Sequence, residues 1–300
     1  MPNWHEIHLQ VKNEGSTFDV VRRRYLRALH KVTGRNVILY YSGWLQNSDA
    51  PVAVDDADKN GFMTVIHGLD RSKGLDLLLH TPGGDVAATE SIVVYLRSMF
   101  GSDIRAIVPQ LAMSAGTMIS CSCKEIVMGK QSSLGPIDPQ FGPFGAREIV
   151  EEFLRAHKEV KTDPAKQFVW GPILQKYHPA LIGKCERAIK WSESLAEDWL
   201  KTGMFKGDNK TNDEVKKIVE DLSNHEEHCS HNRHLGVEKC KRIGLKVVDL
   251  EDDEDFQDAV LSVHHCCIQT LTESNAFKII ENHEGIAFIQ AAHRVVIPKG

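Results

Sequence analysis

Two short segments carry the residues of this chain that could do chemistry. Residues 80–85 read HTPGGD, and residues 112–116, about thirty positions later, read AMSAG. Each follows a short apolar run typical of a buried strand and precedes a stretch with helical character. Glycine backbone N–H groups can bind an anion, and a serine at the start of a helix can serve as a nucleophile. The pair therefore predicts an acyl-transfer site with a backbone oxyanion hole.

Ser114 is the predicted nucleophile of this site. Its neighbours Ala115 and Gly116 leave room for a substrate carbonyl, and the Ala115 N–H would donate to the developing oxyanion. The Gly84 N–H would be the second donor, and Gly83 has no side chain to obstruct the substrate. Loss of one such donor typically costs about 2.7–4 kcal/mol of transition-state stabilisation. Alone, each segment is more often a helix cap or a tight turn, so the prediction depends on the pairing.

The surrounding sequence predicts an α/β fold. Between residues 75 and 128, short apolar strands alternate with helical stretches, which indicates a mainly parallel sheet covered on both faces. Ligands of such sheets bind at the carboxyl ends of the strands, where both segments lie. We expect an N-terminal helical segment over 1–35, an α/β core over 36–145, and a mainly helical extension over 146–300. That extension should contain a histidine-rich loop and end in a C-terminal hairpin.

Composition excludes several classes of protein. The net charge of −5 disfavours nucleic acid as a main partner, and no apolar run has the roughly 20 residues that span a bilayer. The N-terminus is too polar for a secretory signal. The 7 cysteines show no regular framework, which favours a reducing compartment and a cytoplasmic location. No phosphate-binding or dinucleotide motif occurs, so no cofactor is expected.

Longer motifs resemble a known family. HTPGGD and AMSAGT are similar to the oxyanion-loop and nucleophile segments of the Clp proteolytic subunit and of signal peptide peptidase A. RNVILYYSGWL, GLDLLLHTPGGD, VPQLAMSAGTMI and SSLGPIDPQ together look like the serine dehydrogenase proteinase family. The resemblance continues through PALIGKCERAI, SHNRH and DLEDDEDFQDAVLSVHH, and so covers most of the chain. It implies a Clp/crotonase-like spiral of ββα units, a serine peptidase without redox chemistry, and a homo-oligomer.

The proton acceptor is less well defined by the sequence. The resembled family carries Ser, Asp and His in that chain order, which implies Asp138 in GPIDPQ and His231 in SHNRH as the partners of Ser114. Asp138 stands where the Clp subunit has its histidine, and its side chain could instead cap a turn. The other candidate histidines are His178, His234, His264 and His265.

A serine–lysine dyad is the alternative mechanism, by resemblance to signal peptide peptidase A. There the lysine lies roughly fifty residues beyond the serine, which corresponds here to Lys158, Lys161 or Lys166. A catalytic lysine must be desolvated, whereas these three lie in a charged stretch typical of a solvated surface. Lys130 is a further, weaker candidate.

A cluster of histidines and one cysteine raises the question of zinc. His225, His228, Cys229, His231 and His234 fall within ten residues, and Cys240 follows. These are zinc ligand types, but their spacing is not that of a finger and no CxxC accompanies them. We therefore predict no metal. A metal-bound His231 could not accept a proton.

Two other functions fit parts of the pattern. A crotonase-like acyl-CoA hydrolase or hydratase also holds its oxyanion with paired backbone N–H groups, but needs no serine after the second strand. A non-catalytic scaffold could retain the fold alone. The AMSAG segment favours a serine endopeptidase acting on peptides or proteins through an acyl-enzyme.

Overall fold

The computed structural model describes residues 9–10, 18–47, 49–223 and 230–292. No helix within these ranges is both long and apolar enough to cross a membrane.

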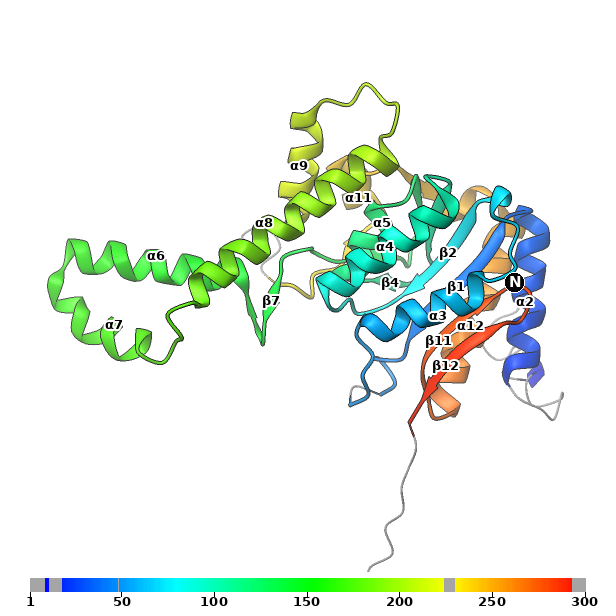
Figure 1. Cartoon of the computed structure of the whole chain (residues 1–300), viewed down its shortest axis with the longest axis horizontal. Coiled ribbons are helices and arrows are strands. Elements are labelled where there is room, and N and C mark those ends of the chain that lie inside the picture. Colours follow the sequence, from blue (N-terminus) through cyan, green and yellow to red (C-terminus); the bar gives the residue numbers. More distant parts are fainter. Residues whose placement is uncertain (1–8, 11–17, 48, 224–229, 293–300) are drawn as a thin grey trace, which may run out of the picture.

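A seven-stranded sheet forms the centre of the described part of the chain (Figure 1). Its spatial order is β10-β5-β3-β2-β1-β11-β12. The first five strands in this order are parallel, and the hairpin β11–β12 adds to β1 in antiparallel orientation. The predicted α/β fold with a mostly parallel sheet is confirmed. The strands are β1 (Asn36–Ser42), β2 (Leu75–His80), β3 (Ile104–Val108), β5 (Glu125–Met128), β10 (Val247–Asp249), β11 (Ala276–Asn282) and β12 (Ala287–Ala291).

Helices cover both faces of this sheet, which explains why every residue of β1 and β2 is buried. One face packs against α2 (Phe18–Thr33) and α12 (Glu254–Glu273). The other packs against α3 (Asp56–Ile66), α4 (Val86–Phe100) and α5 (Ala115–Cys121). Side chains of β2 alternate between the faces, with Leu77 and Leu79 toward α4 and α5 and Leu78 toward α12.

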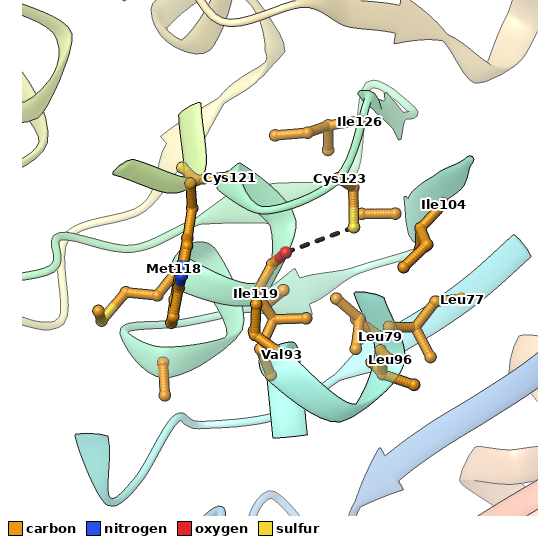
Figure 2. Packing of buried hydrophobic residues seen from close by; sticks show 14 of the residues in the cluster. Leu77, Leu79, Val93, Leu96, Ile104, Met118, Ile119, Cys121, Cys123 and Ile126 are labelled. Atoms are coloured by element: carbon orange, nitrogen blue, oxygen red, sulfur yellow. Dashed lines mark hydrogen bonds between the residues drawn. The ribbon is translucent and has the colours of Figure 1, made fainter. Parts of the chain in front are cut away.

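Buried thiols contribute to the core beneath α5. Figure 2 shows Cys121 and Cys123 among aliphatic side chains of β2, β3, β5 and α4. The Cys123 Sγ donates to the Ile119 carbonyl at 3.4 Å, and burial raises the pKa of this thiol to about 12. All six cysteines in the described ranges are free and buried. They therefore act as small apolar residues.

A small second sheet lies beyond the carboxyl end of β3. It has the order β4-β6-β9, with β4 (Leu111–Ala112) parallel to β6 (Ser133–Leu134) and β9 (Leu235–Gly236) antiparallel to β6. Because of these directions, one edge of the small sheet holds the residues that follow β4 and β6 and the residues that precede β9. That edge holds the candidate site.

A helical arm projects from the sheet (Figure 1). It consists of α6 (Ala146–Thr162), α7 (Gln167–Leu174) and the first part of α8 (Leu181–Trp199), around a small apolar cluster that includes Ile149 and Cys185. The later part of α8 returns to α5 and to α9 (Asn212–Ser223). The remaining elements are η1 (Arg71–Lys73), β7 (Gln140–Phe141), β8 (Phe144–Gly145), η2 (Pro164–Lys166), η3 (Leu200–Met204), α11 (Val237–Ile243) and η4 (Leu250–Asp252).

The central sheet crosses the boundary that we expected near residue 145. Strands β10, β11 and β12 come from the later part of the chain, and α12 packs against α2 from the beginning. The predicted C-terminal hairpin is present, but it is part of the central sheet. The three-part division stays a prediction. The long-range pairing behind this arrangement leaves no local pattern in the sequence.

Two histidines are buried between the sheet and α12. His80 ends β2, and its ring centroid lies 5.6 Å from that of His264 on α12. Tyr41 Oη lies 3.2 Å from His264 Nδ1, whereas neither ring nitrogen of His80 has a hydrogen-bond partner among the described residues. Burial, reinforced by the neighbouring imidazole of His265, lowers the pKa of His264 to about 3. Burial also holds the pKa of His80 well below its usual value.

These depressed values predict acid sensitivity of the fold. A histidine whose pKa is lower in the folded than in the unfolded protein stabilises the fold above about pH 6.5, and this stability is lost as the pH falls below it. Each such histidine should lower the free energy of unfolding by about 1.4 kcal/mol per pH unit there. His264→Gln should therefore reduce the pH dependence of the free energy of unfolding, as measured by urea unfolding between pH 7 and 5. His178→Gln, at an exposed histidine, is the control. If His264→Gln leaves the slope of the unfolding free energy against pH unchanged, the depressed pKa of His264 is contradicted.

Candidate active site

Ser114 has a strained backbone. Its φ of 50° and ψ of −110° make it the sole non-glycine residue with positive φ in the described ranges. Such a conformation typically costs about 1–3 kcal/mol and is retained where the surroundings enforce it, often at functional sites. Ser114 is the N-cap of α5, yet its side chain makes no capping hydrogen bond. Its hydroxyl therefore does not play the structural role that a serine at this position usually plays.

The glycine turn after β2 lies directly against this serine. A Cβ on Gly83, whose φ is +97°, would lie 2.6 Å from the Ser114 Cβ and 2.9 Å from the Ala115 nitrogen. A Cβ on Gly116 would meet the Thr81 Cγ2 at 2.6 Å. Both contacts are closer than real Cβ atoms come, so only glycine lets the two turns approach this far.

A β-bridge to Val54 orients the next residue, Gly84. The Val54 N–H donates to the Gly83 carbonyl at 2.8 Å, and the Asp85 N–H donates to the Val54 carbonyl at 2.9 Å. In a parallel bridge of this kind, the central residue directs its own N–H to the side away from its partner. Gly84 also has no room for a side chain, since a Cβ would lie 2.3 Å from the Val54 nitrogen.

Two backbone donors are consequently open at this point. Ala115 is the first residue of α5, so its N–H has no partner within the helix. Within the described part of the chain, neither the Ala115 nor the Gly84 N–H donates a hydrogen bond. The close contact of Gly83 with Ser114 and the Ala115 nitrogen brings both donors beside the serine. Unpaired backbone N–H groups beside a serine are elements from which an oxyanion hole can be built.

Asp138 and His231 form a hydrogen-bonded pair. The His231 Nδ1 lies 2.8 Å from Asp138 Oδ1, and the Gln140 amide donates to Asp138 Oδ2 at 2.6 Å. Asp138 is 2% exposed, and the His231 side chain is 21% exposed. Because an ionised carboxylate can only accept, Nδ1 carries the proton and Nε2 is left as the basic nitrogen. This tautomer is the one that a general base requires.

The small sheet places this pair on the same edge as the serine. Ser114 follows β4, Asp138 follows β6, and His231 precedes the antiparallel β9. The segment between β6 and Asp138 is fixed from two sides: the Ile137 N–H donates to the Leu222 carbonyl at 3.1 Å, and the Ser192 hydroxyl donates to the Ile137 carbonyl at 2.9 Å. Residues separated by more than a hundred positions thus meet at one sheet edge.

The other candidate bases lie in different surroundings. His178 and His234 are exposed, and His264 and His265 lie on α12, with His264 buried beside His80. The lysines of the alternative dyad are all exposed on the helical arm; they are Lys158, Lys161 and Lys166. The Lys166 Nζ lies 3.2 Å from Glu159 Oε2. Lys130 is also exposed.

The histidine-rich loop is described only in part. His225, His228 and Cys229 lie outside the described residues. Among the described residues, no group of three or more His, Cys, Asp or Glu side chains is arranged to hold a metal ion. Cys240 is buried, and its Sγ donates to the Leu235 carbonyl at 3.3 Å.

Comparison with known proteins identifies the family. The model of the ClpP-like SDH-type serine proteinases matches residues 20–258. The chain belongs to this family. Two uncharacterized proteins of Methanocaldococcus jannaschii are 28% and 30% identical to it over 196 residues, which is 65% of this chain in both cases and 59% and 60% of those proteins. The chain thus spans about 60% of the length of these relatives. Membership in a serine proteinase family agrees with the resemblance seen in the sequence.

Two contributors to the site had no signal in the sequence. Val54, in a polar loop, orients Gly84 through the bridge described above. Gln140 holds the second oxygen of Asp138. Both act through contacts formed by folding, and neither residue type nor spacing marks them beforehand.

The strain at Ser114 can be tested by stability. Glycine adopts this backbone conformation without steric cost, so Ser114→Gly should be more stable than Ser114→Ala by about 1 kcal/mol, after allowing for the greater freedom of glycine in the unfolded chain. Urea unfolding of both variants measures the difference. The same pair of substitutions at Ser98, an exposed residue inside α4, is the control and should favour alanine. Equal stability of the two Ser114 variants would contradict the strain.

Proposed function

We propose that this protein is a serine endopeptidase that cleaves peptide bonds through a Ser114 acyl-enzyme. The observation that carries the proposal is the strained serine beside two open backbone N–H donors, Gly84 and Ala115. The hydrogen-bonded Asp138–His231 pair at the same sheet edge supplies a base of the right tautomer. Membership in the ClpP-like SDH-type serine proteinases supports the same reaction class.

In this mechanism, the Ser114 Oγ attacks the peptide carbonyl while its proton passes to His231 Nε2. Asp138 keeps Nδ1 protonated and stabilises the imidazolium. The Gly84 and Ala115 N–H groups hold the oxyanion, while Gly83 and Gly116 leave space for the substrate. His231 then protonates the leaving amine as the C–N bond breaks. Water, deprotonated by His231, hydrolyses the acyl-enzyme and restores the hydroxyl.

A triad is favoured over a serine–lysine dyad. The candidate lysines are exposed on the arm, and Lys166 forms an ion pair with Glu159. A lysine that takes a proton from serine must be desolvated. By contrast, Asp138 is almost fully buried and already orients an imidazole.

The partners and the location of the protein are also proposals. A homo-oligomer acting on peptides or proteins in the cytoplasm follows from the resemblance to Clp-like peptidases and from the cysteine usage. The crotonase-like acyl-CoA hydrolase or hydratase and the non-catalytic scaffold remain the alternatives.

Covalent labelling separates these functions. A fluorophosphonate probe should modify the wild type at Ser114, as mapped by mass spectrometry, and Ser114→Ala should abolish both labelling and peptide hydrolysis. Ser194→Ala, an exposed serine in α8, is the matched control and should behave like the wild type. Acyl-CoA turnover by an unlabelled protein would support the hydrolase instead. Absence of labelling and of any turnover would support the scaffold.

The role of Asp138 gives a second prediction. Asp138→Asn keeps the shape but favours the wrong tautomer of His231, so kcat for peptide hydrolysis should fall by about 10⁴-fold. Asp163→Asn, an exposed helix cap on the arm, should leave kcat unchanged because asparagine caps equally well. A loss of less than tenfold in Asp138→Asn would remove Asp138 from the mechanism.

A further inference from the structure

A buried lysine contacts the loop that bridges to Gly84, although it lies far from both segments in the sequence. Lys278 is in β11, beyond the residues 20–258 matched by the family, and its side chain is 1% exposed. Burial of an unpaired ammonium would cost several kcal/mol, so its partners must compensate. Asp58 of α3 is the main partner, with its Oδ1 2.8 Å from the Lys278 Nζ.

The same ammonium binds the loop before α3 at two points. The Lys278 Nζ donates to the Ala53 carbonyl at 2.9 Å, and it lies 3.3 Å from Asp55 Oδ2. Ala53 and Asp55 are the two neighbours of Val54 in the chain. A single charged group therefore fixes Val54 from both sides.

Asp58 reinforces this arrangement. Its Oδ2 accepts from the Asp55 N–H at 3.0 Å and from the Tyr40 hydroxyl at 2.8 Å. Both side chains are buried: Asp58 is 0% exposed and Tyr40 is 1% exposed. Charge-assisted hydrogen bonds in such surroundings are stronger than neutral ones and restrict the groups they join.

Val54 in turn determines the position of Gly84. Both hydrogen bonds of the β-bridge use Val54 backbone atoms, one to the Gly83 carbonyl and one from the Asp85 N–H. The chain of contacts therefore runs from Lys278 through Ala53 and Asp55 to Val54, and from Val54 to the turn that carries the open Gly84 N–H.

We infer that Lys278 is a positioning residue for the oxyanion hole, acting through the 53–55 loop to hold the Gly84 N–H. It touches no reacting atom. The kinetic part of this inference rests on the proposed peptidase function, whereas the positional part does not. Displacement of an oxyanion donor by about 1 Å can lower the reaction rate about 10²-fold, so the contacts that hold this turn should strongly affect the rate.

The test is Lys278→Met in the full-length protein. Methionine fills similar space but donates no hydrogen bond. We expect kcat for a peptide substrate to fall about 10- to 100-fold, with KM changed less than about twofold, because the donor acts mainly in the transition state. Affinity for a peptide boronate, which forms a tetrahedral adduct, should fall in parallel with kcat. Amide hydrogen exchange at Asp85 should accelerate at least about tenfold, because its hydrogen bond to Val54 opens more often.

Arg22→Met is the matched control. Arg22 is fully buried and pairs with Glu281 of the same strand, with its Nε 2.5 Å from Glu281 Oε2. Glu281, however, lies on the opposite face of β11, toward α2 and α12. This variant should lose comparable stability while Asp85 exchange and kcat stay within about twofold of the wild type.

The outcomes decide the inference separately from the proposed function. A folded Lys278→Met protein with wild-type kcat and wild-type exchange at Asp85 would overturn it, and so would an equal acceleration of exchange in Arg22→Met.

If Lys278→Met does not fold, Asp55→Asn decides, because asparagine keeps the helix cap and loses only the charge pair with Lys278. Faster exchange at Asp85 but not at Leu78 supports the inference, and no change contradicts it. If the wild type cleaves no peptide, the peptidase proposal fails and the exchange result still applies.

Discussion

The close contact between two strand-end turns is the constraint on which this site depends. Gly83 lies so near Ser114 that no side chain fits between them, and Ser114 adopts a conformation that serine normally avoids. The contact brings the first turn of α5 beside the Gly84 turn. Two N–H groups with no partner in the described part of the chain, those of Gly84 and Ala115, then lie beside the serine. Without this contact, the serine would be an ordinary helix cap and the glycines an ordinary turn.

The remaining architecture supports this contact from two directions. On one side, the small sheet of β4, β6 and β9 brings Asp138 and His231 to the edge that bears Ser114. On the other, the bridge from Val54 holds the glycine turn, and Lys278 of the C-terminal hairpin holds the loop that contains Val54. Both supports depend on residues far away in the chain. The two turns of the candidate site lie close together in the sequence, whereas the residues that orient them come from distant parts of the chain.

This difference explains what the sequence could predict. Alternating apolar strands and helices indicated the α/β fold, and the turn chemistry of HTPGGD and AMSAG pointed to Gly84, Ala115 and Ser114, because those signals lie within a few residues of one another. Asp138 and His231 came from the resemblance to a family, since nothing local joins residues 93 positions apart. The bridge joins Val54 to Gly84, which lies in a different segment, and the burial of Lys278 arises only when β11 pairs with β1. Sheet order of this kind is not written in any single segment.

The roles proposed for the two turns can be tested by the structure of the adduct between Ser114 and a peptide boronate. We expect a bond from Ser114 Oγ to boron, with one boronate oxygen about 2.7–3.1 Å from both the Gly84 and the Ala115 nitrogens. A boronate oxygen that contacts neither N–H, or a boron bound to another side chain, would contradict the assignment of these turns as nucleophile and oxyanion hole.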